Sequence, residues 1–365
     1  MTAPTISPPR VTGVTERSTG TLLPVLRAIP ERCYDRPAWK GVASIARGVA
    51  LYGAVLVALA AADAWWLLVP LWVLAGAAVS GLFVLGHDAA HGALFESKQT
   101  NRIVGRALMV PSLHIYEAWV LGHNRIHHGH TLREGMDFVW HPLTVEAYRD
   151  LSGWQRARHR VEWSFLGAGL YYLREVWWNK MITFTAPERY RAGIRRDTRF
   201  LVTASALLVG ALALVGWFVD GGATGALWFV TKLFVVPFLS FTWWIGFTVY
   251  VHHIARDVKW WPRRSWNSFH GQVEGTTVLR VPWILNLFFC NIFVHVPHHV
   301  DVRIPWYSLP AAADAIAAAF PDAVVERRLR ARDYVAETRA CKLYDFTAQR
   351  WLPYAAARRS GAITE

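Results

Sequence analysis

The sequence predicts an all-α integral membrane protein with four transmembrane helices in two hairpins and a helical cap on the cytosolic side. Three observations lead to this fold class. Hydrophobic residues make up 53% of the 365 residues, they fall in long blocks, and basic residues are concentrated beside those blocks. A soluble chain of this length spreads its apolar residues periodically, so the block pattern is typical of a membrane protein.

The first apolar block runs from about Ile45 to Val84, and Lys and Arg are absent between Arg47 and Lys98. One membrane crossing needs about 20 apolar residues, so the block is long enough for two. A polar turn at Asp63, followed by Trp65 and Trp66, divides it near the middle. We therefore expect crossings at about residues 45–62 and 66–86.

The second apolar block runs from about Phe200 to Val251 and is divided by Asp220, Gly221 and Gly222. This division predicts crossings at about residues 200–219 and 226–251. Lys232 is the only Lys or Arg in the block. Because it follows the dividing turn closely, we expect its side chain to reach the outer membrane interface.

The orientation follows from the positions of the basic residues. Neither dividing turn contains Lys or Arg, whereas the flanking segments 156–160, 189–199 and 256–264 are rich in Arg. The positive-inside rule then places both termini and the central segment in the cytosol, most simply at a bacterial cytoplasmic membrane. The net charge of +13 is explained by these flanks, so we do not expect nucleic acid as a partner.

The same pattern divides the chain into three parts. Residues 1–40 are expected to form a polar cytosolic N-terminal arm without a cleavable signal peptide, residues 41–310 the membrane domain, and residues 311–365 a cytosolic C-terminal helical tail. The apolar stretches 107–121 and 281–294 are short for a crossing and are expected to be interfacial or re-entrant. The three cysteines lie far apart, which argues against a disulfide framework or a zinc ribbon.

Eight of the 15 histidines fall in three short clusters. The clusters are His87 with His91, then His123, His127 and His128, and finally His295, His298 and His299. Spacings of three and four residues put side chains on one face of a helix, within reach of one metal site. The predicted topology brings all three clusters to the same membrane face.

The number and type of these side chains indicate a site for two metal ions. Eight or nine imidazoles exceed what one ion binds, and the clusters contain no cysteine ligand of the kind used in structural zinc or iron–sulfur sites. Imidazole suits iron, copper, zinc and nickel about equally, so spacing does not choose among them. A non-catalytic metal transporter or a haem electron carrier is the alternative outside enzymes. A transporter should carry ionisable groups within its crossings, and haem needs only two axial histidines.

The three clusters, in this order and spacing, resemble the histidine boxes of the membrane fatty acid desaturase family. The segment Tyr250 to His253 resembles the end of that family's fourth crossing, where a ninth histidine ligand lies. The segment Cys341 to Asp345, followed by Trp351, resembles the tail of omega-6 type acyl-lipid desaturases. The resemblance extends over roughly residues 62–354.

This resemblance implies a di-iron centre. Its ligands would be His87, His91, His123, His127, His128, His295, His298 and His299, with His253 as the ninth. Its neighbour His252 stands where the family often has glutamine, so the choice between these two stays open. Asp88 lies between two ligands and is expected to orient an imidazole by a hydrogen bond, its alternative being a carboxylate at a helix end that faces basic residues.

The resemblance also implies a reaction and its partners. The protein would introduce a cis double bond into a fatty acyl chain, carried by a lipid or a thioester, using O2 and two electrons from a ferredoxin or cytochrome. Electrostatic steering by the basic flanks favours an acidic donor. A hydroxylase, ketolase or acetylenase acting on a lipid or carotenoid is the nearest alternative. The isolated histidines His114, His130, His141, His159 and His270 are assigned to surface or interface positions.

Overall fold

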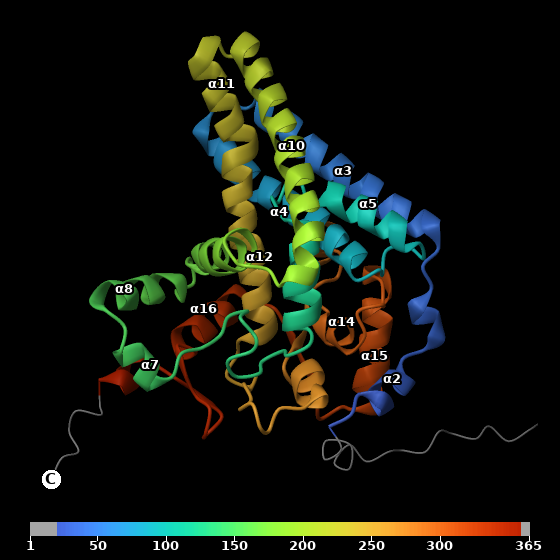
Figure 1. The fold of residues 1–365 in the computed structure, drawn as a ribbon, viewed down its shortest axis with the longest axis vertical. Coiled ribbons are helices and arrows are strands. Elements are labelled where there is room, and N and C mark those ends of the chain that lie inside the picture. The colour runs from blue at the N-terminus through green and yellow to red at the C-terminus, as the bar shows by residue number, and fades with distance from the viewer. Residues whose placement is uncertain (1–19, 359–365) are drawn as a thin grey trace, which may run out of the picture.

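The computed structural model of the protein describes residues 20–358. The remainder of the predicted N-terminal arm (residues 1–19) and the end of the predicted tail (residues 359–365) lie outside the described residues. The fold is mostly helical and elongated, with the joined ends of α10 (Glu188–Val219) and α11 (Gly222–Val230) at one extreme of the long axis and α14 (His295–Val300) and α15 (Leu309–Ala319) near the other (Figure 1).

Four helices are long and apolar enough to span a membrane, and they contain the four expected crossings almost entirely. They are α3 (Ala38–Ala61), α4 (Trp65–Ala90), α10, and the stretch Gly222–His253, which consists of α11, the π-helix η4 (Thr231–Val235) and α12 (Val236–His253). Helix α10 begins at Glu188, well before the expected crossing at residue 200, because its polar first part continues the same helix beyond the apolar block.

Helices α4 and α12 form the centre of the bundle and pack against each other. They approach closely at Gly76, where a Cβ atom would lie 2.3 Å from Oγ of Ser240. On the other side, Gly246 of α12 meets α9 (Ala168–Tyr171), and a Cβ atom there would lie 2.3 Å from the carbonyl oxygen of Ala168. Small residues allow such close backbone approach between helices in a membrane.

Helices α3 and α10 lie outside this pair and are mostly exposed. Their exposed side chains are large and apolar, as at Val57 on α3 and Leu207 on α10. A contiguous exposed apolar surface of this kind indicates contact with lipid. The four helices therefore fit a membrane protein.

Lys232 is buried rather than exposed at an interface. Its ammonium donates hydrogen bonds to the carbonyl oxygens of Ala60 and Ala62, at 3.2 and 3.3 Å, and lies 3.9 Å from a carboxylate oxygen of Asp63. The side chain thus satisfies carbonyl groups at the C-terminal end of α3, which have no partner within the helix. The expected snorkelling was wrong in this detail, because a nearby helix end supplies the acceptors.

The remaining elements surround the ends of α4 and α12 and include strands as well as helices. The helices are α2 (Leu23–Ala28), α5 (Lys98–Leu108), α6 (Tyr116–Trp119), α7 (Val145–Arg149), α8 (Gly153–Glu162), α13 (Trp283–Phe289) and α16 (Ala331–Ala340). The shorter 3₁₀- and π-helical segments are η1 (Glu31–Tyr34), η2 (Val120–His127), η3 (Tyr172–Ile182), η5 (His270–Glu274), η6 (Trp306–Ser308) and η7 (Tyr354–Ala357).

Two small two-stranded sheets are also present, whereas a purely helical cap had been expected. Strand β1 (Thr277–Arg280) pairs in parallel with β2 (Val325–Arg328), and Thr277 lies opposite Val325. Strand β3 (Leu343–Asp345) pairs antiparallel with β4 (Arg350–Leu352). Three of these strands fall in the C-terminal segment that was expected to be helical. They are only three or four residues long, and strands this short carry too few residues for an alternating pattern to be recognised.

Two further expectations concern the shorter segments. The apolar stretches 107–121 and 281–294 contain only short helices, α6 and α13, neither of which is long enough to span a membrane. In the N-terminal arm, residues 23–34 form α2 and η1 and bury Val25, Ile29 and Cys33 against α15. This part of the arm is therefore packed against the cap, whereas a polar arm had been expected.

Candidate metal centre and apolar cavity

The histidines of all three clusters come from helix ends that meet at one end of the bundle. His87 is in the last turn of α4 and His91 follows that helix; His252 and His253 end α12. The second cluster lies on η2 and the residue after it, and the third on α14. All of these side chains are buried except His91, which is partly exposed.

A π-helix explains the spacing of the second cluster. The N–H of His128 donates to the carbonyl oxygen of His123 at 3.0 Å, which is the i to i+5 bond of a π-helix. This wider turn puts residues four and five apart on the same side of the helix. The side chains of His127 and His128 therefore lie on the same side as that of His123. Single π turns of this kind are frequent at functional sites.

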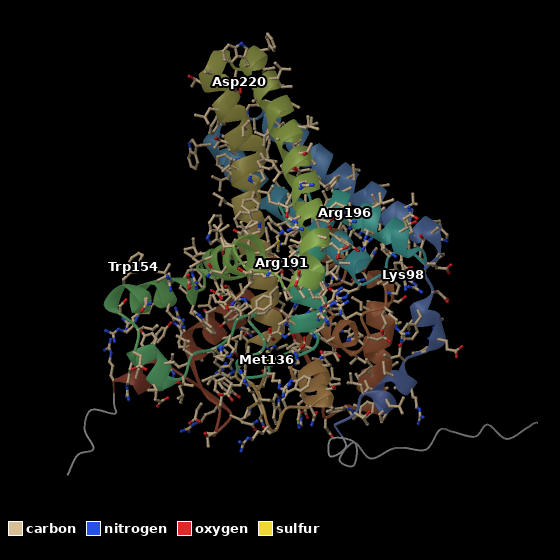
Figure 2. All side chains as sticks on the ribbon, in the orientation of Figure 1. Lys98, Met136, Trp154, Arg191, Arg196 and Asp220 are labelled. Atoms are coloured by element: carbon tan, nitrogen blue, oxygen red, sulfur yellow. The ribbon has the colours of Figure 1, made fainter. Side chains whose placement is uncertain are left out.

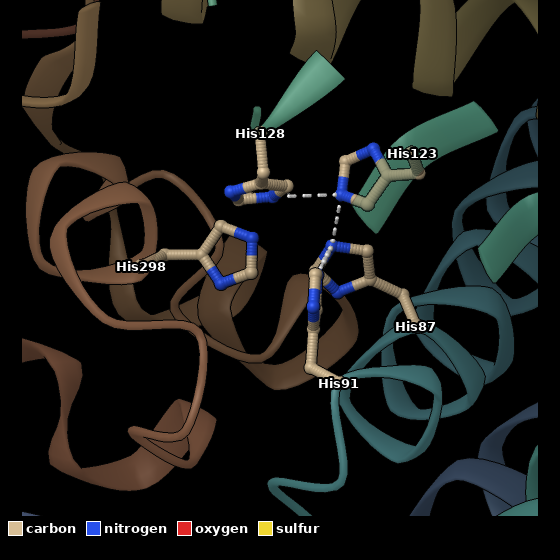
Figure 3. A group of neighbouring side chains, drawn as sticks. All are labelled: His87, His91, His123, His128 and His298. Atoms are coloured by element: carbon tan, nitrogen blue, oxygen red, sulfur yellow. Dashed lines mark hydrogen bonds between the residues drawn. The ribbon is translucent and has the colours of Figure 1, made fainter. Parts of the chain in front are cut away.

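Five imidazoles form the first group, shown in Figure 3. One ring nitrogen from each of His87, His91, His123, His128 and His298 lies within 4.8 Å of the others. Nε2 of His123 is 2.8 Å from Nε2 of His87 and 3.1 Å from Nε2 of His128, and the Nε2 atoms of His87 and His91 are 3.2 Å apart. Nitrogens bound at right angles to one ion at about 2.1 Å are about 3 Å apart, so these separations match neighbouring metal ligands.

A second group lies beside the first. Ring nitrogens of His127, His253 and His299 lie within 4.8 Å of one another, and so do those of His252, His253 and His295. His295 also meets His299, with their Nε2 atoms 3.1 Å apart. Helix α14 contributes to both groups, because His295 and His299 lie one turn apart on one face and His298 is directed to the first group.

The Nδ1 atoms of the second group donate to oxygen atoms behind the rings. His127 donates to Oδ1 of Asp137 at 3.0 Å, His253 to the carbonyl oxygen of Gly275 at 3.0 Å, and His299 to Oε1 of Gln272 at 2.9 Å. His295 donates to the carbonyl oxygen of Ile292 at 3.2 Å. Hydrogen bonds of this kind fix the tautomer and leave Nε2 free to bind a metal.

Asp137 and Gln272 hold two of the clustered imidazoles by hydrogen bonds, and the sequence did not reveal them. Burial opposes ionisation of Asp137, but His127 and the backbone N–H groups of Leu132 and Val139 outweigh it and hold the pKa of the carboxyl below its usual value. Asp88, which had been expected to orient an imidazole, has one carboxylate oxygen 3.4 Å from Nδ1 of His87. Its other oxygen accepts a hydrogen bond from the N–H of Trp306 at 3.0 Å.

Burial favours the neutral form of several of these imidazoles. Burial, followed by the neighbouring His87 and His91, lowers the pKa of His298 well below its usual value. Burial also dominates the lowered pKa values of His123, His128 and His299. Neutral imidazole is the metal-binding form, so the site is prepared to bind metal without first losing protons.

The donor set fits metal ions. Nε2 of His253 and Nε2 of His298 are buried and have no hydrogen-bond partner within residues 20–358, although buried polar atoms normally have one. An ion at each group would satisfy these atoms. His252 stacks on His295 with ring centroids 3.7 Å apart, and its ring nitrogen lies in a group with those of His253 and His295 but not with those of His127 and His299.

A cavity of about 710 Å³ lies beside the two nitrogen groups; we call it the apolar cavity. Its walls come mainly from α4, η2, η3 and α12, with apolar side chains such as Phe83, Val176 and Ile245. Six imidazoles also line it: His87, His123, His127, His252, His253 and His295.

The isolated histidines are more buried than the sequence suggested. His114 is buried and lies 2.8 Å from the hydroxyl oxygen of Tyr172, and His159 is buried, stacks on Trp163 and lies 2.7 Å from the hydroxyl oxygen of Tyr354. Their assignment to surface or interface positions was wrong, because Tyr172 and Tyr354, which contact these rings, come from distant segments of the chain. Neither contacts the two nitrogen groups.

Comparisons with known proteins agree with this geometry. The family model described as fatty acid desaturase matches residues 64–331. The sn-1 oleoyl-lipid 12-desaturase of Picosynechococcus sp. is 29% identical over 94% of this chain and 96% of its own length. That of Anabaena variabilis is 28% identical over 80% of each chain. The chloroplastic omega-6 fatty acid desaturase of Arabidopsis thaliana is 29% identical over 81% of this chain and 63% of its own length.

The family model alone matches well over half of the chain, and the matched residues include both nitrogen groups and the apolar cavity. The chain belongs to the fatty acid desaturase family, and it is an enzyme, a fatty acid desaturase.

Proposed function

We propose that this desaturase acts on acyl chains of membrane lipids and introduces a cis double bond at a di-iron centre, using O2 and two electrons. The observation that carries the proposal is the meeting of two groups of imidazoles with one apolar cavity. The names of the relatives in Picosynechococcus and Anabaena, which describe oleoyl-lipid desaturases, support an acyl lipid as the substrate class.

The two nitrogen groups support a division of ligands between two iron ions. The first ion would be held by five histidines and the second by four. The ligands would be His87, His91, His123, His128 and His298 for the first ion, and His127, His253, His295 and His299 for the second. His253 is preferred to His252 because it belongs to a common group with His127 and His299 and its Nδ1 is held by Gly275.

Iron supplies the oxidising power that an unactivated methylene requires, since such a carbon has neither an acidic proton nor a leaving group. In the overall reaction two hydrogens leave adjacent carbons, a carbon–carbon double bond forms, and O2 with two electrons and two protons becomes two molecules of water. The residues of this chain hold the acyl chain beside the metal ligands and exclude water from it. Phe83, Val176 and Ile245 provide the apolar walls for this task.

The proposed orientation places the histidine end in the cytosol of a bacterial cell, with two hairpins crossing the cytoplasmic membrane. The Arg-rich flanks support this orientation by the positive-inside rule, and the turns at Asp63 and Asp220 lack Lys and Arg. Residues 41–310 would form the catalytic membrane domain and residues 311–365 the cytosolic tail. An acidic ferredoxin or cytochrome would then deliver electrons from the cytosolic side.

Lipid profiling after expression in a host without polyunsaturated fatty acids tests the function. The protein should convert monounsaturated chains to products that have lost two hydrogens, as measured by mass spectrometry of the lipid extract. The variant His298→Ala, expressed at the same level, should give none. A product that gains one oxygen atom would assign the protein to hydroxylation and contradict the proposed reaction.

A further inference from the structure

A second, polar cavity of about 1050 Å³ adjoins the apolar cavity and is called here the polar vestibule. It is bounded by the loop 135–143, by α8 and by η3. Phe138 and Lys180 line both cavities and form the wall between them. An acyl chain that fills the apolar cavity would therefore bring its polar end to these two residues.

The charged groups of the vestibule are paired with one another. The guanidinium of Arg174 donates to Oε2 of Glu162 and to Oε2 of Glu175, both at 2.8 Å, and Arg158 lies 3.9 Å from Oε1 of Glu162. The carboxylates thus already offset most of the positive charge. A vestibule of this kind suits an uncharged polar group better than a carrier with several phosphates, which would need unpaired cations.

Lys180 differs from the other cations of the vestibule. Its ammonium lies 3.6 Å from Oε1 of Glu175, and it makes no hydrogen bond within the part of the chain that the structure describes. The side chain is 44% exposed. An ammonium has three N–H donors, so Lys180 has donors available at the boundary between the apolar cavity and the vestibule.

An apolar groove of about 1080 Å³ lies on the other side of the vestibule and is called here the membrane-side groove. It shares Arg158, Glu162 and Arg174 with the vestibule and is otherwise lined mainly by large apolar side chains. Trp154 at its edge is 74% exposed, and Leu170 is exposed as well. Three cavities therefore follow one another from the outer surface to the metal ligands.

The position of α8 fits the membrane interface. In Figure 2, Trp154 lies at about the same height along the long axis as Arg191 and Lys98, which flank two of the spanning helices, and far from Asp220 at the tip of the bundle. Aromatic and basic side chains together are enriched at this level of membrane proteins. A short helix with exposed Trp and several Arg residues is typical of one that lies on the membrane surface.

From these observations we propose that Lys180 binds the ester carbonyl of a membrane glycerolipid, and that the lipid enters sideways from the bilayer through the membrane-side groove and the polar vestibule. The acyl chain passes Phe138 into the apolar cavity, the glycerol and head group stay in the vestibule, and an N–H of Lys180 donates to the carbonyl oxygen. This inference rests on the proposed function, because it assumes that the chain in the apolar cavity is desaturated.

Steady-state kinetics with two substrates test the site. The purified protein is supplied with its electron donor and with vesicles that contain a neutral dioleoyl galactolipid, or with oleoyl-CoA in the same vesicles without that lipid. The wild type should desaturate the galactolipid and act poorly on oleoyl-CoA. In Lys180→Met the KM for the galactolipid should rise about tenfold with kcat changed less than twofold, which corresponds to a hydrogen bond of about 1.4 kcal/mol.

Two variants provide the controls. Lys180→Arg keeps a donor and should restore most of the affinity. Lys98→Met, which lies across the molecule from Trp154 of the membrane-side groove in Figure 2, should leave KM unchanged. Metal content measured on each variant shows that the centre is intact. An unchanged KM in Lys180→Met, or a wild type that prefers oleoyl-CoA, would overturn the inference and leave the desaturase intact. A wild type that desaturates neither substrate would refute the proposed function, and the inference with it.

Discussion

The Nδ1–H of His127 donates a hydrogen bond at 3.0 Å to Oδ1 of Asp137, ten residues further along the chain. The same carboxylate accepts from the backbone N–H of Leu132 at 2.9 Å and of Val139 at 3.0 Å. Asp137 is fully surrounded and cannot turn away from the imidazole. The contact connects the loop 135–143, which bounds the polar vestibule, with a proposed metal ligand that lines the apolar cavity.

Replacing this carboxylate should weaken metal binding. Asp137→Asn keeps the shape of the side chain but removes the charge that orients His127 and raises its basicity, so iron affinity or activity should fall about 10- to 100-fold. The measurement is iron retained after dialysis against a chelator, together with the initial rate. Asp88→Asn is the matched control, because Asp88 is 3.4 Å from His87 and should have the smaller effect. A larger loss in Asp88→Asn would reverse the assigned roles.

The adjacent residues His252 and His253 should behave differently. His253→Ala removes a proposed ligand and should lower iron content by about one ion per chain and abolish activity, because its Nε2 has no other partner among the described residues. His252→Ala removes a ring that stacks on His295 and whose nitrogen lies in a group with those of His253 and His295 but not with those of His127 and His299, so iron should be retained and some activity should remain. Elemental analysis and product assays on the two purified variants make the comparison. Equal iron loss in both would make His252 a ligand.

The stability of the protein should depend on pH through His159. Burial, and then the charges of Lys342 and Arg174, lower the pKa of His159 to about 3. The unfolded chain binds the proton near pH 6.5, so stability is complete above that pH and is lost as the pH falls toward 3, by about 2 kcal/mol at pH 5. In detergent micelles, the unfolding temperature of the wild type should therefore fall between pH 7.5 and pH 5.

His159→Phe provides the matched variant for this titration. It fills much of the same space against Trp163 without a titrating group, and its unfolding temperature should fall less over the same pH range. His159→Ala should be destabilised at every pH, since the ring is buried. At the surface or interface position that the sequence suggested for His159, the same change would have little effect. Parallel pH profiles for the wild type and His159→Phe would show that another group controls the transition.

The proposed electron donor should be sensitive to charge on one particular surface. Arg328 and Arg330 are exposed, and neither has an ion pair within residues 20–358. They line a groove of about 550 Å³ that also includes Tyr250, Val251 and Ile254, the residues on either side of His252 and His253. An acidic donor bound there would be close to the second nitrogen group, and its association would be steered by these charges.

The double variant Arg328→Glu, Arg330→Glu should raise the KM for an acidic ferredoxin several-fold at low ionic strength, and the rate of the wild type should fall as salt is added. Arg195→Glu on α10 reverses an exposed charge elsewhere and serves as the control. Rates measured at a saturating lipid concentration and varied donor concentrations give the KM for the donor in the double variant and in Arg195→Glu. If the wild-type rate does not change between low and high salt, the arginines serve only the membrane orientation.

The sequence predicted the parts of the protein that follow a regular spacing. Uninterrupted apolar blocks predicted the four spanning helices, and the spacing of His87 with His91 and of His295 with His299 predicted which side chains would share a face. The family resemblance agreed with the matched family model. These features depend on short-range periodicity, which a single sequence contains.

Other features depend on long-range contacts and could not be predicted in this way. Asp137 and Gln272 reach His127 and His299 from segments whose spacing has no relation to the clusters. Lys180 gains its position only because η3 lies beside the loop that carries Phe138. The burial of His114 and His159 likewise involves Tyr172 and Tyr354, which distant segments contribute.

The central claim is that nine histidines hold two iron ions beside the acyl chain. The most direct test is the number of iron ions per chain in purified, active protein, determined by elemental analysis together with protein quantification. The account predicts about two iron ions per chain in the wild type, and a lower content with no desaturation in His298→Ala. Full desaturase activity in a wild-type preparation with less than one iron ion per chain, or with another metal in its place, would contradict it.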